Sequence, residues 1–430
     1  MTSTAILIET LTTLKANLEP YIPDRVTEGY GLNKKAISEL ADGGAKLIIT
    51  VDGGIRSKEE VKLAKNLGLD VIITDHHIAP AFAKATAGKT GEKSGLPDCL
   101  IINPIVDGEQ YPYKKLAGAG VAFKVAKAII SKSKLAEESK KKLEEKILDL
   151  AAIGTVADCV SLLGENRNLV KRGLEVLNNT KRVGLKELIN VAEIKGKIDS
   201  WNIAFQIAPR LNAAGRMDHA NTAFELLVTK NKEEAQALAR RLNEKNTDRQ
   251  RITKEIVEQI SSDFEQSAMD DKIIIAVSPP DNIWNEGVIG LAAGKLSERY
   301  YRPALVITRG EEGLKGSGRS IDEFNIMEAI EECAEFLEKY GGHPAACGFC
   351  LKEENLEKFS AKIKKITADK LAEINLRPKI TIEAELKLGD IGEELINSVN
   401  QFAPFGEDNE RPKFASFGAR IVDIFNMGTD

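Results

Sequence analysis

The sequence Val71-Ile72-Ile73-Thr74-Asp75-His76-His77 joins an apolar run to a carboxylate and two adjacent imidazoles. It predicts a buried strand with polar groups at its carboxyl end. Open α/β folds place their functional sites at the carboxyl ends of parallel strands. Imidazole and carboxylate ligands together suit Mn²⁺, Fe²⁺ or Zn²⁺ better than an all-oxygen Ca²⁺ site. The ordinary alternative is a pair of surface histidines at a strand end, and the tripeptide by itself leaves both interpretations open.

The segments around this strand predict a parallel sheet. Residues 45–51 form a second apolar run, and residues 99–102 form a third. Residues 57–67 have the composition of a helix, with Ser57 as its N-cap. Strands that alternate with helices indicate a parallel sheet covered by helices on both faces. The fold class is therefore predicted to be α/β.

The chain begins with a predicted helix instead of a strand. Residues 4–18 read as an amphipathic helix with Leu7, Leu11, Leu14 and Leu18 on one face. A parallel α/β domain normally supplies a strand before such a helix. We therefore expect the first strand of the domain to be missing.

Further along, the pattern changes several times. Residues 116–195 look mostly helical, and residues 231–266 predict a long, mostly solvated helix that joins two domains. A second α/β unit follows, with strands at 272–277 and 304–308 and a helix at 288–300. Residues 380–386 and 419–425 alternate like half-buried strands, which predicts a small β domain that is cut short.

Composition limits the class of protein. The 430 residues are 43% hydrophobic and 29% charged, which predicts a soluble protein of several domains. No apolar run approaches the ~20 residues of a membrane span, and no secretory signal is evident. Five irregularly spaced cysteines favour free thiols in a reducing cytoplasm. The net charge of −5 means that nucleic-acid binding would need a local basic groove.

Carboxylates accompany the two histidines at neighbouring positions of the predicted sheet. Asp52 ends the strand at 45–51, and successive parallel strands are neighbours about two-thirds of the time. Asp158 lies in a largely apolar stretch, where a carboxylate is usually paired or metal-bound. Together with His76 and His77, these residues predict a site for one divalent ion and part of a second. A helix N-cap role for Asp52 and a buried salt bridge for Asp158 remain open alternatives.

Three other clusters offer groups that could bind phosphate. Glycines such as Gly342 permit close backbone approach to a ligand, and His343 beside it can donate to a phosphate oxygen. Ser317 offers a hydroxyl, and Arg319 offers a guanidinium that matches phosphate geometry. The third cluster contains Arg210, Asn212 and Arg216. Turns and ordinary surface contacts explain each of these patterns equally well.

The combination of motifs resembles the DHH phosphoesterase superfamily. The motifs are Asp-His-His after a strand, Val-Asp-Gly-Gly at 51–54, Gly-Thr-Val-Ala-Asp at 154–158 and Gly-Gly-His-Pro-Ala-Ala at 341–346. Their order and spacing are most similar to the RecJ-type exonucleases of bacteria, which degrade single-stranded DNA in the 5′→3′ direction. The match runs nearly end to end.

The resemblance implies a DHH domain over residues 1–230, a connecting helix over 231–266, a DHHA1 domain over 267–375 and a partial OB fold over 376–430. It implies metal-dependent hydrolysis of phosphodiester bonds, with Mn²⁺ or Mg²⁺ in a two-ion site. The implied setting is DNA repair and recombination in the cytoplasm, away from membranes. The implied partner is single-stranded DNA with a 5′ end, and a single-strand-binding protein and a helicase are candidate protein partners.

The resemblance also implies roles for individual residues. Asp52, as the bridge between two ions, would bind metal together with His76 and Asp158. His77 would contact a metal or the scissile phosphate, and Asp75 would orient a histidine from behind it. The phosphate-binding set comprises Arg25, Ser317 and Arg319 for the 5′-terminal phosphate, Arg216 and His343 near the cleavage site, and Arg210, Asn212 and Gly342 within the same motifs.

One departure from the family pattern affects the expected activity. The first family motif, a strand ending in Asp-Tyr-Asp-x-Asp-Gly, carries two more carboxylate ligands and would lie just before Thr2. We therefore expect an incomplete metal site and little or no nuclease activity. Two alternatives remain: a DHH phosphoesterase acting on short oligonucleotides, and a non-catalytic relative that binds single-stranded DNA. The long helix and the C-terminal β domain disfavour the first, and the retained acidic motifs disfavour the second.

Overall fold

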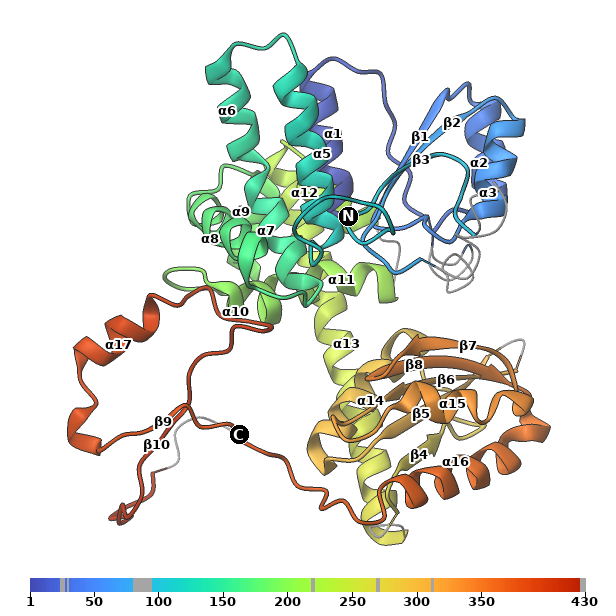
Figure 1. Ribbon diagram of the computed structural model, residues 1–430, viewed down its shortest axis with the longest axis vertical. Helices are drawn as coiled ribbons and strands as arrows, with labels where there is room; N and C mark the ends of the chain where they lie inside the picture. Colours follow the sequence, from blue (N-terminus) through green and yellow to red (C-terminus); the bar gives the residue numbers. More distant parts are fainter. Residues whose placement is uncertain are drawn as a thin grey trace. The chain divides into compact units, whose positions relative to one another are not determined.

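The structure is a computed structural model that describes residues 1–23, 28, 31–79, 95–217, 221–267, 271–310 and 313–425. The chain divides into two units, residues 1–243 with 381–430, and residues 244–380. Each of the two units contains a sheet with helices packed against it (Figure 1). The predicted α/β class with a parallel sheet is confirmed.

The sheet of the first unit is parallel, and the last residues of its three strands are aligned with one another. Its strands are β1 (Leu47–Val51), β2 (Asp70–Thr74) and β3 (Leu100–Ile102), in the order β1-β2-β3. Val51 pairs with Thr74, and Thr74 pairs with Ile102. Residues that follow β1 and β2 therefore emerge side by side. Helices α2 (Lys34–Asp42) and α3 (Lys58–Asn66) cover one face of the sheet (Figure 1).

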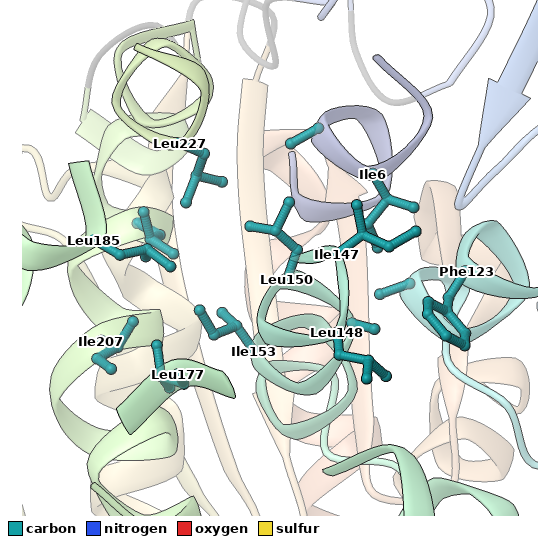
Figure 2. Packing of buried hydrophobic residues seen from close by; sticks show 14 of the residues in the cluster. Ile6, Phe123, Ile147, Leu148, Leu150, Ile153, Leu177, Leu185, Ile207 and Leu227 are labelled. Atoms are coloured by element: carbon teal, nitrogen blue, oxygen red, sulfur yellow. The ribbon is translucent and has the colours of Figure 1, made fainter. Parts of the chain in front are cut away.

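A helical layer contains the main core of the first unit. It is built around α1 (Thr2–Thr13), α5 (Gly118–Lys132), α7 (Leu148–Ala157) and α8 (Gly164–Asn178). Figure 2 shows Leu148 of α7 toward Phe123 of α5, and Ile153 of α7 toward Leu177 of α8, within one buried cluster. A Cβ atom built on Gly154 would lie 2.3 Å from the Cβ of Ala119. Close packing thus holds α7 on several sides. The other helices of this layer are α6 (Glu137–Lys146), α9 (Val183–Val191), α10 (Ser200–Asn202), the π-helix η1 (Ile203–Ile207), α11 (Ala208–Met217) and α12 (Asn221–Val228).

The first helix differs from the prediction. It runs from Thr2 to Thr13 instead of over residues 4–18, and Lys15 has a left-handed backbone with φ 62°. Its buried side chains include Ile6 and Thr10 besides the predicted Leu7. The leucine stripe did not show this wider buried face, because α1 packs against both α5 and α7 and not against a single surface.

The second unit combines the end of a long helix with a mixed sheet. Helix α13 (Lys232–Ser267) spans 36 residues, and its apolar positions Leu242, Ile256 and Ile260 are buried. The sheet has the order β4-β5-β6-β8-β7, in which only β4 and β5 pair in parallel. Its strands are β4 (Ile274–Val277), β5 (Ala304–Gly310), β6 (Gly313–Arg319), β7 (Leu337–His343) and β8 (Ala346–Leu351). Helix α14 (Glu286–Tyr300) packs on β5 and β6, and the opposite face carries α15 (Ile326–Glu331) and α16 (Leu356–Lys370).

The C-terminal segment has less β structure than the sequence predicted. The predicted strand at 380–386 is reduced to β9 (Ala384–Glu385), which pairs in parallel with β10 (Phe414–Ala415). Helix α17 (Glu393–Asn400) comes between these two strands in the sequence. The predicted strand at 419–425 is wrong. Val422 and Phe425 are 85% and 79% exposed, and no described strand pairs with this segment. Alternating apolar residues form a strand only where a neighbouring strand supplies hydrogen bonds.

The five cysteines are free, as predicted, and two of them, Cys347 and Cys350, lie in β8. Among the described residues, no helix combines the length and the apolar composition that a membrane crossing requires.

Candidate metal centre

Asp52 follows β1 in an unusual backbone conformation. Its amide donates to the Thr74 carbonyl at 2.9 Å, which extends the pairing of β1 and β2 by one residue. Its φ of 59° lies in the left-handed region, which is uncommon for residues other than glycine. The Thr50 hydroxyl donates to the Gly53 carbonyl at 2.7 Å and secures the turn. Backbone strain of this kind clusters at functional sites, where the surrounding structure maintains it.

The carboxylate of Asp52 lies against the start of α5. A Cβ atom built on Gly118, the first residue of that helix, would lie 2.2 Å from Asp52 Oδ1. Any larger residue at position 118 would therefore displace the carboxylate. The helix N-terminus also favours negative charge. Sequence reasoning missed Gly118, although a glycine at the start of a predicted helix was the available signal.

Asp75 is fully buried and organises the histidine pair. It accepts hydrogen bonds from the amides of Ile55, His76 and His77 at 3.0, 2.7 and 3.1 Å. His77 Nδ1 lies 2.7 Å from Asp75 Oδ1. Burial alone would raise the pKa of Asp75, but the hydrogen bonds from His77 and the amides outweigh it and lower the pKa. The same bond raises the pKa of His77. In a neutral His77 that donates from Nδ1, Nε2 is the acceptor nitrogen.

His76 lies between two carboxylates from different elements. Its Nε2 atom is 3.1 Å from Asp52 Oδ1 and 3.4 Å from Asp158 Oδ2, and its side chain is only 13% exposed. Burial would lower the pKa of His76, but the bond to Asp52 and the charge of Asp158 raise it. Burial raises the pKa of Asp158 to about 6. The structure thus brings Asp52, His76 and Asp158 together at the carboxyl edge of the sheet.

The donor set fits a divalent cation. Ligand atoms of Asp52, His76 and His77 lie within 4.8 Å of one another, and this is the one such group within the described ranges. One imidazole nitrogen and two carboxylate oxygens, with a second imidazole nearby, form a mixed nitrogen and oxygen set of the kind that first-row divalent ions bind. A cation would also offset the repulsion between the Asp52 and Asp158 carboxylates.

The second unit collects four of the candidate phosphate-binding residues on one sheet. Arg319 of β6 and His343 of β7 both pair with Ala346 of β8, so the three residues form a row across the sheet. A Cβ atom built on Gly342 would lie 2.2 Å from the Ala346 carbonyl oxygen, so this close approach requires glycine. Ser317 lies two residues before Arg319 on the same face.

Helix α14 borders this row on one side. A Cβ atom built on its Gly290 would lie 2.9 Å from Ser317 Oγ and 3.3 Å from an Arg319 guanidinium nitrogen. His343 and Gly348, on the strands beyond, are exposed. This part of the sheet is therefore accessible at His343 and carries the Arg319 guanidinium where it meets α14.

The remaining candidates are not brought into this arrangement. Arg210 donates to the Asn243 side chain at 2.9 Å and to the Gln206 carbonyl at 2.8 Å, so its guanidinium is engaged within the helical layer. Asn212 is exposed on α11. Arg25 lies outside the described residues, as does the side chain of Arg216.

A cavity of about 1390 Å³ runs beside β1 in the first unit. It is lined by α1, residues 16–23, α2 and β1 up to Asp52, and the predicted site residue Asn212 also lines it. β1 is the edge strand of the described sheet, so its outer backbone groups face this cavity. The cavity therefore adjoins the candidate metal ligand Asp52.

Family models match three successive parts of the chain. The DHH family N-terminal domain matches residues 1–155, the DHHA1 domain matches 270–369 and the RecJ OB domain matches 382–430. A single-stranded-DNA-specific exonuclease RecJ from Salmonella typhimurium is 32% identical over 96% of this chain and 72% of its own length. The chain belongs to the RecJ family. The resemblance inferred from the ordered motifs is confirmed.

Other RecJ proteins agree with this assignment. RecJ from Bacillus subtilis is 40% identical over the whole of this chain, which covers 52% of that protein. The crystal structure of RecJ with Mn²⁺ from Thermus thermophilus matches with a TM-score of 0.80 at 30% identity, over 97% of this chain and 57% of that one. Another RecJ structure, bound to manganese, matches with a TM-score of 0.70 at 34% identity, over 87% of this chain and 89% of that one. The chain thus spans about half the length of the Bacillus and Thermus relatives and shares the RecJ fold.

Proposed function

We propose that this RecJ chain binds Mn²⁺ or Mg²⁺ through Asp52, His76 and Asp158 and hydrolyses single-stranded DNA from a 5′ end. The observation that carries the proposal is the position of His76 Nε2 between two carboxylates at the carboxyl edge of a parallel sheet. Relatives solved in complex with Mn²⁺ or Mg²⁺ support the choice of ion. Such an ion, when bound, polarises a phosphate oxygen as a Lewis acid.

The neighbouring residues would orient the substrate. His77 would direct Nε2 toward a metal or the scissile phosphate, because Nδ1 is held by Asp75. In the second unit, Ser317, Arg319, Gly342 and His343 would bind DNA phosphates, with Arg319 supplying a guanidinium suited to phosphate oxygens. Arg25, Arg210, Asn212 and Arg216 complete the proposed phosphate-binding set. A role in DNA repair and recombination in the cytoplasm, with a single-strand-binding protein and a helicase as partners, extends the proposal.

The test of the proposal is metal-dependent digestion of single-stranded DNA by this chain, whose described cluster offers Asp52 and Asp158 as its carboxylates. With Mn²⁺, the chain should release nucleotides from a long, end-labelled, 5′-phosphorylated strand, and a chelator should abolish the release because the ion supplies the Lewis acid. Duplex DNA is the control substrate and should remain undigested. Absence of Mn²⁺-dependent release would refute the proposal, and a preference for dinucleotides would favour the short-oligonucleotide alternative.

Asp75→Asn should weaken Mn²⁺ binding about 10-fold, because groups that orient metal ligands typically contribute 10- to 100-fold in affinity. An asparagine side chain has no negative charge to attract His77. Its NH₂ group also cannot accept the hydrogen bonds that the backbone amides of Ile55 and His76 donate to the two Asp75 oxygens. Mn²⁺ titration followed by electron paramagnetic resonance would measure the change. Asp70→Asn is the matched control, since Asp70 is exposed at the opposite end of β2. Unchanged affinity in the Asp75 variant would show that this carboxylate does not support the site.

A further inference from the structure

A turn in the region matched by the OB model lies against the loop that joins α7 to α8. We define residues 401–409, between α17 and β10, as the docking turn. The guanidinium of Arg167 donates to the carbonyl of Gln401 at 3.1 Å and to the carbonyl of Phe402. The amide of Leu162 donates to the carbonyl of Glu407 at 2.8 Å. The turn is therefore bound to both the loop and the first turn of α8.

Two other contacts fix the same turn from different sides. Lys115 Nζ lies 2.8 Å from Asp408 Oδ2. The Ser200 hydroxyl, at the start of α10, donates to the Phe405 carbonyl at 2.5 Å. Most contacts to the docking turn thus end on main-chain carbonyls, so they depend on the shape of its backbone.

Internal hydrogen bonds preserve that shape. The Asn409 side chain donates to the carbonyls of Phe402 and Pro404 at 3.0 and 2.8 Å, and the backbones of Gly406 and Asn409 bond in both directions at 3.0 Å. A Cβ atom built on Gly406 would lie 2.5 Å from Leu162 Cδ1. Only glycine permits the turn to approach Leu162 this closely.

The loop beneath the turn begins at a candidate metal ligand. Asp158 ends α7, where its amide donates to the Gly154 carbonyl at 3.1 Å. Cys159 then adopts a left-handed backbone with φ 52°, and the buried Leu162 follows three residues later. α7 fixes the loop at one end, and the docking turn fixes it at Leu162. Displacement of the turn would therefore shift the backbone that carries the Asp158 carboxylate.

We propose that the docking turn is a positioning element that holds Asp158 in place for metal binding. This inference rests on the proposed metal site and deepens it. It assigns to the OB-matched region a contribution to the metal centre in addition to any contact with DNA. Misplacement of a reacting or binding group by about 1 Å costs on the order of 100-fold in activity. Loss of the contacts that fix this loop should therefore have a measurable effect on metal binding.

The test measures Mn²⁺ affinity of the whole chain in variants of this contact. Gly406→Val introduces a clash with Leu162, and Arg167→Ala removes two hydrogen bonds to the turn. Both variants should weaken Mn²⁺ binding about 10-fold, and Arg167→Lys should restore part of the affinity. Arg172→Ala, on the exposed surface of the same helix, should bind Mn²⁺ like the unaltered chain.

Hydrogen exchange supplies a second readout that does not depend on activity. Both variants should lose amide protection at residues 159–163 while α5 and α7 keep theirs, which excludes general unfolding. Unchanged Mn²⁺ affinity in both variants, with binding abolished by Asp52→Asn, would overturn this inference and leave the metal site intact. Absence of Mn²⁺ binding in the unaltered chain would overturn both.

Discussion

Asp52→Asn should raise the dissociation constant for Mn²⁺ by more than about 100-fold, beyond the 10- to 100-fold typical of supporting groups. Asp52 Oδ1 lies 3.1 Å from His76 Nε2, so the two atoms can share one cation. The amide is similar in shape but carries no charge to offset that of a divalent ion. Isothermal titration of the whole chain with Mn²⁺ would measure the loss, and nuclease activity should fall with it.

The effect should be separable from stability. Without a metal, Asp52 attracts His76 but repels Asp158, and these two effects oppose one another. The variant should therefore unfold within a few degrees of the unaltered chain. Asp42→Asn is the matched control, because Asp42 is an exposed carboxylate at the end of α2. If the unaltered chain binds one Mn²⁺ ion and Asp52→Asn binds it with the same affinity, then Asp52 is not a ligand and the ion lies elsewhere.

Much of this centre could be anticipated from local patterns. The apolar run before Asp75 predicted β2, and the preceding strand of the chain, β1, supplied Asp52 at its end. Parallel pairing in register then brings the two strand ends together without further information. Asp158 was found through its apolar surroundings, which match the buried helix α7.

Other features depend on contacts between segments far apart in the sequence. The approach of Gly118 to Asp52 involves residues 66 positions apart, and no local pattern encodes that distance. The hydrogen bond from Arg210 to Asn243 likewise joins residues 33 positions apart. The segment 419–425 failed as a strand for the same reason, since local alternation does not guarantee a neighbouring strand.

A buried charge cluster holds the base of α7, the helix that ends at Asp158. The Arg182 guanidinium lies 3.0 Å from both oxygens of Asp149, and it also contacts Glu9 of α1. The side chains of Arg182 and Asp149 are 9% and 1% exposed. Thr180 donates to Asp149 at 3.1 Å. Burial raises the pKa of Asp149, although the charge of Arg182 opposes this. A buried pair of this kind adds little net stability, but loss of either partner destabilises the fold.

Asp149→Ala should therefore lower the free energy of unfolding of the first unit by about 3 kcal/mol, the lower end of the range for a broken buried pair, because Arg182 keeps Glu9 as its other partner. Asp149→Asn should lose less, since its side-chain oxygen can still accept from Arg182 and Thr180. Urea unfolding followed by far-ultraviolet circular dichroism would measure both. Glu138→Ala, which breaks an exposed pair with Lys142, should leave the urea midpoint unchanged. An Asp149→Ala midpoint equal to that of Glu138→Ala would mean that water reaches Arg182 and that the cluster does not hold α7.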